Sequence, residues 1–125
     1  MTRSKLIRSG CAAVAFFMVV ILFVGAEKAA HVPLFPPPFD KLAHFTYYGI
    51  VAALLAHAVG LRWLWIPLVL VPLIGAGDEW HQSMIVGRDS SVWDWVADGL
   101  GTVFAVYVYY RFMHRTGGGE VPNVD

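Results

Sequence analysis

The polarity of this chain follows a simple pattern, in which long apolar stretches alternate with short segments that hold most of the charged residues. The apolar stretches cover about 10–26, 40–59, 63–84 and 93–113. Each has close to the roughly 20 residues with which an α-helix crosses a bilayer. The pattern therefore predicts four helices over these ranges in one domain, 1–115, followed by a Gly-rich, disordered tail over 116–125.

The composition of the chain is typical of a membrane protein. Hydrophobic residues make up 58% of the 125 residues and charged residues 14%, whereas a soluble domain is roughly 45–50% apolar. A soluble fold of this size would have too few polar side chains to cover its surface. We therefore expect an all-α, integral membrane four-helix bundle. The net charge of zero gives no indication of nucleic-acid binding, and a single cysteine excludes an internal disulfide.

The ends of the helices are indicated by residues with strong conformational preferences. Asp40 is expected to cap the second helix and Gly60 to end it. Because the link over 60–62 is short, the second and third helices should be antiparallel neighbours. Pro67 and Pro72 fall within the predicted third helix and predict bends in it. Residues 27–39 and 85–92 are expected to form two loops on the same side.

Small residues indicate where helices approach closely. Ala97, Gly101 and Ala105 recur every four residues in the fourth helix and predict a tightly packed face. Gly75 and Gly77 in the third helix allow close backbone approach just before its acidic residues. The sequence therefore predicts that the third and fourth helices each have one face against a neighbouring helix.

The first apolar stretch has two interpretations. It follows a basic segment, and small residues stand near Ala29 and Ala30, so a cleaved signal peptide is one alternative. The apolar run is long, however, and no clean small-x-small cleavage site stands at its end. We therefore expect it to be retained as the first membrane helix.

The basic residues predict the orientation in the membrane. Cytoplasmic segments are enriched in lysine and arginine, and more of these residues fall on the side of the two chain ends than on the side of the two longer loops. Both termini are therefore expected in the cytoplasm of a bacterial cell, with the chain in the inner membrane. The basic residues on the side of the chain ends are Arg3, Lys5, Arg8, Arg62, Arg111 and Arg115, and those on the other side are Lys28, Lys41 and Arg88.

Polar side chains recur at spacings of three and four residues at the outer ends of three helices, so that each row shares one side of its helix. Burying ionisable groups at a membrane helix is costly, about 2.5–3.5 kcal/mol or more per charge at mid-membrane. We therefore expect the rows to converge in a polar pocket roofed by the loop at Gly87 and Arg88. The rows are Asp40, Lys41, His44 and Tyr47 or Tyr48 in the second helix, Asp78, Glu79, His81 and Gln82 in the third, and Asp94, Asp98 and Gly101 in the fourth.

Four of these motifs, in this order over about half of the chain, resemble the VanZ-like family of small bacterial membrane proteins. They are Asp40-Lys41-x-x-His44, Glu79-x-x-Gln82, Gly87-Arg88 and Asp94-x-x-x-Asp98-x-x-Gly101. The chain departs from the family pattern at Asp98, where asparagine is frequent, and at Val86, where proline is frequent. The resemblance implies a role in the cell envelope and a link to glycopeptide resistance, and it supplies no mechanism.

Our leading hypothesis is that the pocket recognises an amphiphilic, anionic envelope molecule, either a lipid-linked phosphate or a lipoglycopeptide. Cationic groups would bind the anion, with arginine supplying two parallel hydrogen bonds, and carboxylates and an amide would orient them. The candidate cations are Arg88, Lys41 and His44, and the candidate orienting residues are Asp40, Asp78, Glu79, Gln82, Asp94 and Asp98.

A membrane-embedded enzyme is the first alternative. Glu79, Asp98 and His44 are the candidate catalytic residues, because carboxylates and imidazoles transfer protons to or from a phosphate or glycan head group. A hard divalent cation that bridges a phosphate is a second form of this hypothesis. Its candidate ligands are Asp78, Glu79, His81, Asp94 and Asp98.

Structural roles are the second alternative. Asp40 and Lys41 could form a local ion pair, and Glu79 with Gln82 could fix the third helix against the fourth, with Arg88 as counter-charge. The chain would then be a subunit of an envelope complex. A proton-coupled exporter is disfavoured because the carboxylates gather at one end of the helices. Residues expected outside the site are His31, His57 and His114, and those expected in an interfacial aromatic belt are Trp63, Trp65, Trp80, Trp93 and Trp95.

Overall fold

The computed structural model describes residues 2–28, 35–36 and 38–117, and in these residues it is all-helical. Helix α1 spans Arg3–Lys28, α2 spans Phe39–Val59, α3 spans Trp65–Ser83 and α4 spans Val92–Gly117. A short 3-10 helix, η1, covers Leu61–Trp63 between α2 and α3. The prediction of an all-α chain with four long helices is therefore confirmed.

Two of the helices are longer than predicted. Helix α1 begins at Arg3 and continues through Lys28, so the basic first segment and the start of the expected first loop are helical. Lysine, arginine and glutamate are good helix formers, and no proline interrupts this run. Helix α4 continues to Gly117, which shortens the predicted tail. The rest of that tail, 118–125, and most of the first loop, including His31, lie outside the described residues.

One prediction about a helix end was wrong. Asp40 is not the cap of α2, because Pro38 occupies that position and Asp40 accepts a hydrogen bond from the neighbouring amide of Lys41 (2.8 Å) inside the first turn. Pro67 and Pro72 both lie within α3, as predicted, but Pro67 is in the first turn, where a missing N–H costs no helical hydrogen bond, so only Pro72 interrupts the helix interior. Gly60 does end α2, with a φ of +81° that suits glycine.

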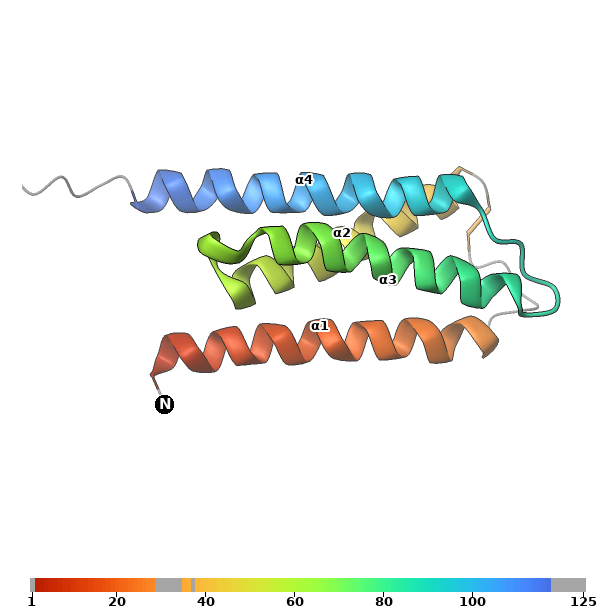
Figure 1. The fold of residues 1–125 in the computed structure, drawn as a ribbon, viewed down its shortest axis with the longest axis horizontal. Helices are drawn as coiled ribbons and strands as arrows, with labels where there is room; N and C mark the ends of the chain where they lie inside the picture. Colours follow the sequence, from red (N-terminus) through yellow and green to blue (C-terminus); the bar gives the residue numbers. More distant parts are fainter. Residues whose placement is uncertain (1, 29–34, 37, 118–125) are drawn as a thin grey trace, which may run out of the picture.

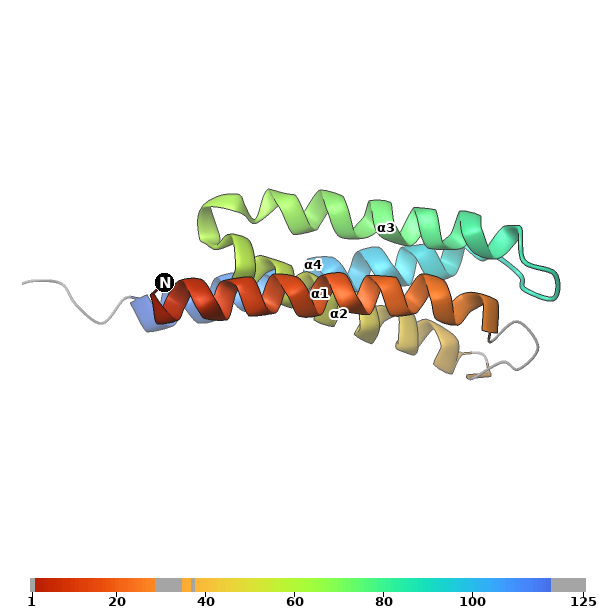
Figure 2. The same ribbon diagram turned by 90° about the horizontal axis from the view of Figure 1, so that it is seen from below.

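The helices run alternately up and down in a bundle. Figures 1 and 2 together place α1 and α4 on opposite sides, with α2 and α3 filling the space between them. The start of α1, the end of α4 and the turn between α2 and α3 lie at one end of the bundle. The first residues of α2 and α4 and the last residues of α3 therefore meet at the other end.

The apolar core is built from small and β-branched side chains at the centre of the bundle. Ala52 and Ala56 of α2 and Val71 of α3 have no exposed surface. Gly101 of α4 lies so close to α2 that an added Cβ atom would overlap the backbone carbonyl of Phe45. The prediction of a tightly packed small-residue face around Gly101 is confirmed, and α4 has this face against α2.

Helices α1 and α2 are each long and apolar enough to cross a membrane, over Arg3–Ala26 and Phe39–Val59. By length and composition alone this is weak evidence, because soluble core helices and signal sequences share these properties. Large apolar side chains are also exposed on every helix, among them Phe16, Leu73 and Phe104.

Arg8 of α1 closes the end of α2. Its Nε donates a hydrogen bond to the carbonyl of Ala58 (2.7 Å), and its terminal nitrogen donates to the carbonyl of Val59 (2.7 Å). The last carbonyls of a helix have no partners within that helix and carry partial negative charge. The guanidinium therefore supplies donors where α2 needs them.

We expect Arg8→Ala to lower the free energy of unfolding by about 1 kcal/mol, the usual net contribution of exposed hydrogen bonds of this kind. Unfolding of the purified protein in detergent, followed by circular dichroism, measures the change. Lys5→Ala is the matched control, since Lys5 lies on the same helix and is exposed. An equal effect of the two substitutions would contradict the capping role.

Candidate functional site

Polar side chains from three helices converge at one end of the bundle and form a buried cluster, here called the polar cluster. Most of its carboxylates are buried: Asp78 and Asp98 have no exposed surface, and Glu79 and Asp94 are also buried. The members are Asp40, Lys41, His44 and Tyr48 of α2, Asp78, Glu79 and Gln82 of α3, and Asp94, Asp98 and Thr102 of α4.

Two cationic residues one turn apart on α2 pair with two aspartates one turn apart on α4. Lys41 Nζ lies 3.0 Å from an Asp94 carboxylate oxygen and 3.1 Å from Asp40. His44 Nδ1 lies 2.8 Å from Asp98 Oδ1, and its Nε2 lies 3.8 Å from Asp94 Oδ2. The matching register of the two helices brings each pair together. The spacing in the sequence predicted that the two rows meet, but not which residues pair.

Asp78 joins α3 to α2 in the interior. Its Oδ2 accepts a hydrogen bond from the hydroxyl of Tyr48 (3.1 Å) and another from the side-chain amide of Gln82 (2.9 Å). Tyr48 is itself almost completely buried. This pair of donors to one oxygen settles which of the two adjacent tyrosines belongs to the cluster, because Tyr47 instead donates to the backbone of Met18 in α1.

Glu79 and Trp95 connect α3 to α4. Glu79 Oε2 accepts a hydrogen bond from the backbone amide of Ser91 (2.7 Å), just before α4 begins. Trp95 Nε1 donates to the carbonyl of Pro72 (2.9 Å). Glu79 therefore holds the start of α4, and Trp95 has a structural hydrogen bond in addition to the interfacial position that the sequence suggested.

Three carboxylate oxygens of the cluster are buried and have no hydrogen-bond partner among the described residues: Asp78 Oδ1, Glu79 Oε1 and Asp98 Oδ2. Leaving a buried acceptor unpaired costs about 1–3 kcal/mol, and more when it is charged. Gly75 makes room for one of them, since a Cβ at this position would lie 2.7 Å from Asp98 Oδ2. The cluster thus contains acceptor groups that the described residues do not satisfy.

One group within the cluster has the composition of a metal site. His44, Glu79 and Asp98 each offer one ligand atom, and these three atoms lie within 4.8 Å of one another. Asp78 and Asp94, also predicted as cation ligands, belong to the cluster but not to this group. The fifth predicted ligand, His81, has its ring beside Phe23 of α1 (5.5 Å between centroids).

Arg88 is the one predicted binding residue that the structure does not bring into the cluster. It is partly exposed in the loop before α4, and it has no ion pair with any other described residue. The alternative in which Arg88 is the counter-charge of Glu79 is not borne out in the described residues, because no ion pair joins the two side chains. His57 and His114 lie toward the opposite end of α2 and α4, as expected.

Sequence reasoning did not single out two contributors. Thr102 is fully buried and donates to the carbonyl of Asp98 (2.8 Å). Thr102 lies four residues after Asp98, so its position on the polar side of α4 could have been predicted from the sequence. The amide of Ser91 could not have been identified, because a backbone donor leaves no mark in the residue pattern.

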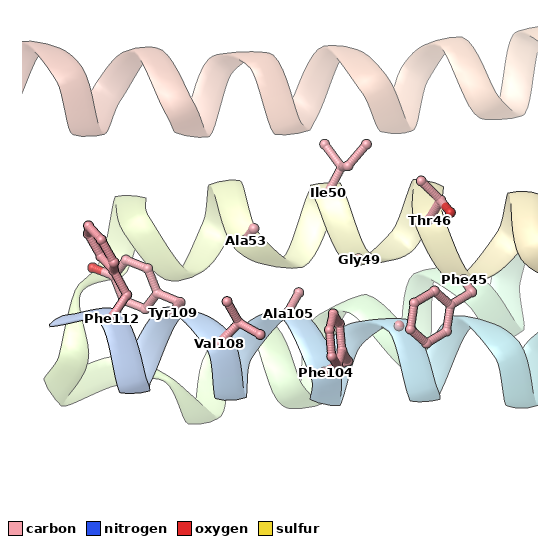
Figure 3. Close-up of a pocket in the computed structure, with 11 residues that line it drawn as sticks. Phe45, Thr46, Gly49, Ile50, Ala53, Phe104, Ala105, Val108, Tyr109 and Phe112 are labelled. Carbon is pink, nitrogen blue, oxygen red and sulfur yellow. The ribbon is translucent and has the colours of Figure 1, made fainter. Parts of the chain in front are cut away.

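Two apolar grooves lie along α2, and one of them also runs along α4. The larger, about 490 Å³, runs along α2 and α4 from Phe45 to Phe112, and Figure 3 shows its lining side chains. The smaller, about 320 Å³, is lined by Phe39, Leu42 and other residues of the first turns of α2. Neither groove has a charged lining residue, and both include Thr46 and Ile50.

Comparisons of the chain with protein-family models, with curated proteins and with solved structures give no match. The resemblance to VanZ-like proteins therefore stays a prediction that depends on the four motifs quoted above.

Proposed function

We propose that this chain is a multi-pass protein of the bacterial inner membrane, similar to the VanZ-like proteins, whose four helices all cross the bilayer. Exposed apolar side chains on every helix support this proposal, since a bilayer would cover them. Both termini lie in the cytoplasm in this proposal. The basic residues Arg3, Lys5 and Arg111 lie toward the end of the bundle opposite the polar cluster, which agrees with enrichment of basic residues on the cytoplasmic side.

The first helix is retained in the mature protein in this proposal. Its contacts with the rest of the bundle support retention: Arg8 binds the end of α2, Tyr47 donates to the backbone of Met18, and Phe23 packs beside His81. Cleavage after the first helix would remove all three contacts.

The proposed function is recognition of an amphiphilic, anionic envelope molecule at the outer face of the membrane. A lipid-linked phosphate and a lipoglycopeptide share the required chemistry. One observation carries the proposal: an apolar groove runs along α2 and α4, two of the helices that supply the polar cluster. Phe45 of the groove follows His44 directly, and Gly101 lies one turn after Asp98. A head group at the cluster would therefore place its acyl chain in the groove.

The cations best suited to the head group are Lys41 and Arg88. A lysine ammonium has three N–H donors. Two of those on Lys41 bind Asp40 and Asp94. Its side chain is 40% exposed, so the third donor can reach a ligand. Arg88 is free of ion pairs with the described residues. His44, by contrast, is engaged by Asp98 and orients the cluster.

Mass spectrometry of the envelope lipids that co-purify with the protein tests this function. We expect wild type to retain an anionic lipid and Arg88→Gln to retain at least about 10-fold less, the effect of losing 1.4 kcal/mol of binding energy. Ala53→Trp, which fills the groove, should have the same effect. Val103→Trp is the matched control, since Val103 is exposed on α4 and does not line the groove.

Two results would contradict recognition of an amphiphile. One is a folded wild-type protein that retains no lipid from the envelope extract. The other is equal retention by wild type, Arg88→Gln and Ala53→Trp. If these substitutions changed only the stability of the protein, the polar cluster would have a structural role, as in a subunit of an envelope complex.

An enzyme acting on the phosphate or glycan of the same lipid is the second candidate function. The 2.8 Å contact of His44 with Asp98 favours it, because a carboxylate orients an imidazole for proton transfer. The unpartnered Oε1 of Glu79 is a further candidate acid or base. Glu79→Gln distinguishes the two functions. If the protein is a pure binder, wild type leaves the head group unchanged and Glu79→Gln keeps most of the affinity for the lipid. If it is an enzyme, wild type changes the head group, whereas Glu79→Gln binds the lipid and leaves the head group unchanged.

A further inference from the structure

We propose that His44, Glu79 and Asp98 bind a divalent transition-metal ion at the end of the bundle. The three side chains come from α2, α3 and α4, so an ion at this point would join three helices. Their ligand atoms already lie within 4.8 Å of one another. Metal bonds of about 2.1 Å in a tetrahedral site place the ligand atoms about 3.4 Å apart, so the three side chains must rotate toward one another to complete the site.

The charge of the polar cluster favours a bound cation. Its carboxylates outnumber its cationic side chains, and most of them are shielded from water. Unbalanced buried charge of one sign is strongly unfavourable unless the group takes up a proton or a counter-charge is supplied, and a bound cation is one such counter-charge. Arg88 does not supply it, because it has no ion pair with the described residues. The carboxylates are Asp40, Asp78, Glu79, Asp94 and Asp98, and the cationic side chains are Lys41 and His44.

Two of the proposed ligands have an oxygen that needs a partner. Asp98 is fully buried and Glu79 is 9% exposed. Asp98 Oδ2 and Glu79 Oε1 nevertheless accept no hydrogen bond from any described residue. The other oxygen of each carboxylate is occupied, by His44 and by the Ser91 amide respectively. A cation would satisfy both orphaned groups at once, which the packing of the chain alone does not achieve.

His44 lies close to two carboxylates but does not yet have the outer hydrogen bond of a metal-binding histidine, because its Nε2 is 3.8 Å from Asp94, beyond hydrogen-bond distance. Such a histidine usually donates its second ring N–H to a carboxylate, which fixes the ring and raises its basicity. The two ring nitrogens of His44 face different aspartates: Nδ1 faces Asp98, and Nε2 lies 3.8 Å from Asp94. Metal at Nδ1, shared with Asp98, would leave Nε2–H for Asp94. Asp94 is therefore a positioning residue in this proposal.

The ligand types select the class of ion. Calcium takes six to eight oxygen ligands, and magnesium retains several waters. One imidazole nitrogen with two carboxylates suits zinc or iron(II) better, because imidazole is a good ligand for these softer ions. We therefore expect Zn²⁺ to bind with higher affinity than Ca²⁺ or Mg²⁺.

The test is titration of the purified, metal-free full chain with Zn²⁺ alone, without added lipid, so that its result is independent of the proposed function. We expect one saturable site per chain. Asp94→Asn should weaken it about 10-fold to 100-fold, the range seen for outer carboxylates, and His44→Gln and Glu79→Gln should weaken it further. His57→Gln and Asp89→Asn are the matched controls, since His57 lies at the other end of α2 and Asp89 is exposed.

A spectroscopic measurement keeps the test decisive if a variant folds poorly. Co²⁺ substituted at the site of the wild-type protein should give ligand-field absorption bands, which report nitrogen and oxygen coordination directly. The absence of saturable Zn²⁺ binding to folded wild type would overturn the proposal. Equal affinity in wild type and His44→Gln would also overturn it, as would Ca²⁺ binding at least as tightly as Zn²⁺.

Discussion

Replacing Gly101 by alanine is expected to lower the free energy of unfolding by about 3 kcal/mol, the upper end of the usual cost of overpacking. The added Cβ atom would overlap the backbone carbonyl of Phe45, which cannot rotate away as a side chain can. Helix α2 would have to move away from α4. That movement would also pull His44 from Asp98, because His44 directly precedes Phe45 and Asp98 lies one turn before Gly101. Unfolding in detergent measures the loss.

Gly99→Ala is the control for this prediction. Gly99 lies on the same helix, but within the described part of the chain no atom outside its own helical turn lies within 4 Å of its added Cβ. Alanine is a better helix former than glycine by about 1 kcal/mol. We therefore expect Gly99→Ala to leave stability unchanged or to raise it. If both alanines had the same effect, the close contact of α4 with α2 would not be a determinant of stability.

The helices could be predicted from the sequence because their apolar runs are long and their breaks are marked by glycine and proline. Gly60 identified the end of α2 correctly. The ends of α1 and α4 were placed too far inward, since charged residues beside the apolar runs, such as Arg8 and Glu27, were taken as the limits of the helix. Charge limits the part of a helix that can lie in lipid, but it does not end a helix.

The polar cluster could be predicted because its residues recur with the period of a helix. That period placed Lys41 and His44 on one side of α2 and Asp94 and Asp98 on one side of α4. Periodicity does not determine which side chain reaches which partner. Arg88 illustrates this limit, because it lies in a loop, where no helical period fixes the direction of its side chain.

Replacing Asp78 by alanine is the second substitution with a large expected effect. Asp78 Oδ2 is the shared acceptor for Tyr48 of α2 and Gln82 of α3. Its removal leaves two buried donors without a partner, at about 1–3 kcal/mol each. Loss of a buried carboxylate with one unpaired oxygen offsets part of this cost. We expect a net loss of about 3 kcal/mol in the free energy of unfolding.

A double-mutant cycle separates this hydrogen bond from other effects of the substitution. Tyr48→Phe removes only the hydroxyl and should cost about 1 kcal/mol in the wild-type background. In the Asp78→Ala background it should cost nothing or even stabilise, because the hydroxyl no longer has its acceptor. Asp89→Ala, an exposed carboxylate, should stay within about 0.5 kcal/mol of wild type. If Tyr48→Phe cost the same in both backgrounds, the Tyr48–Asp78 hydrogen bond would make no contribution, and α2 and α3 would be joined by apolar packing alone.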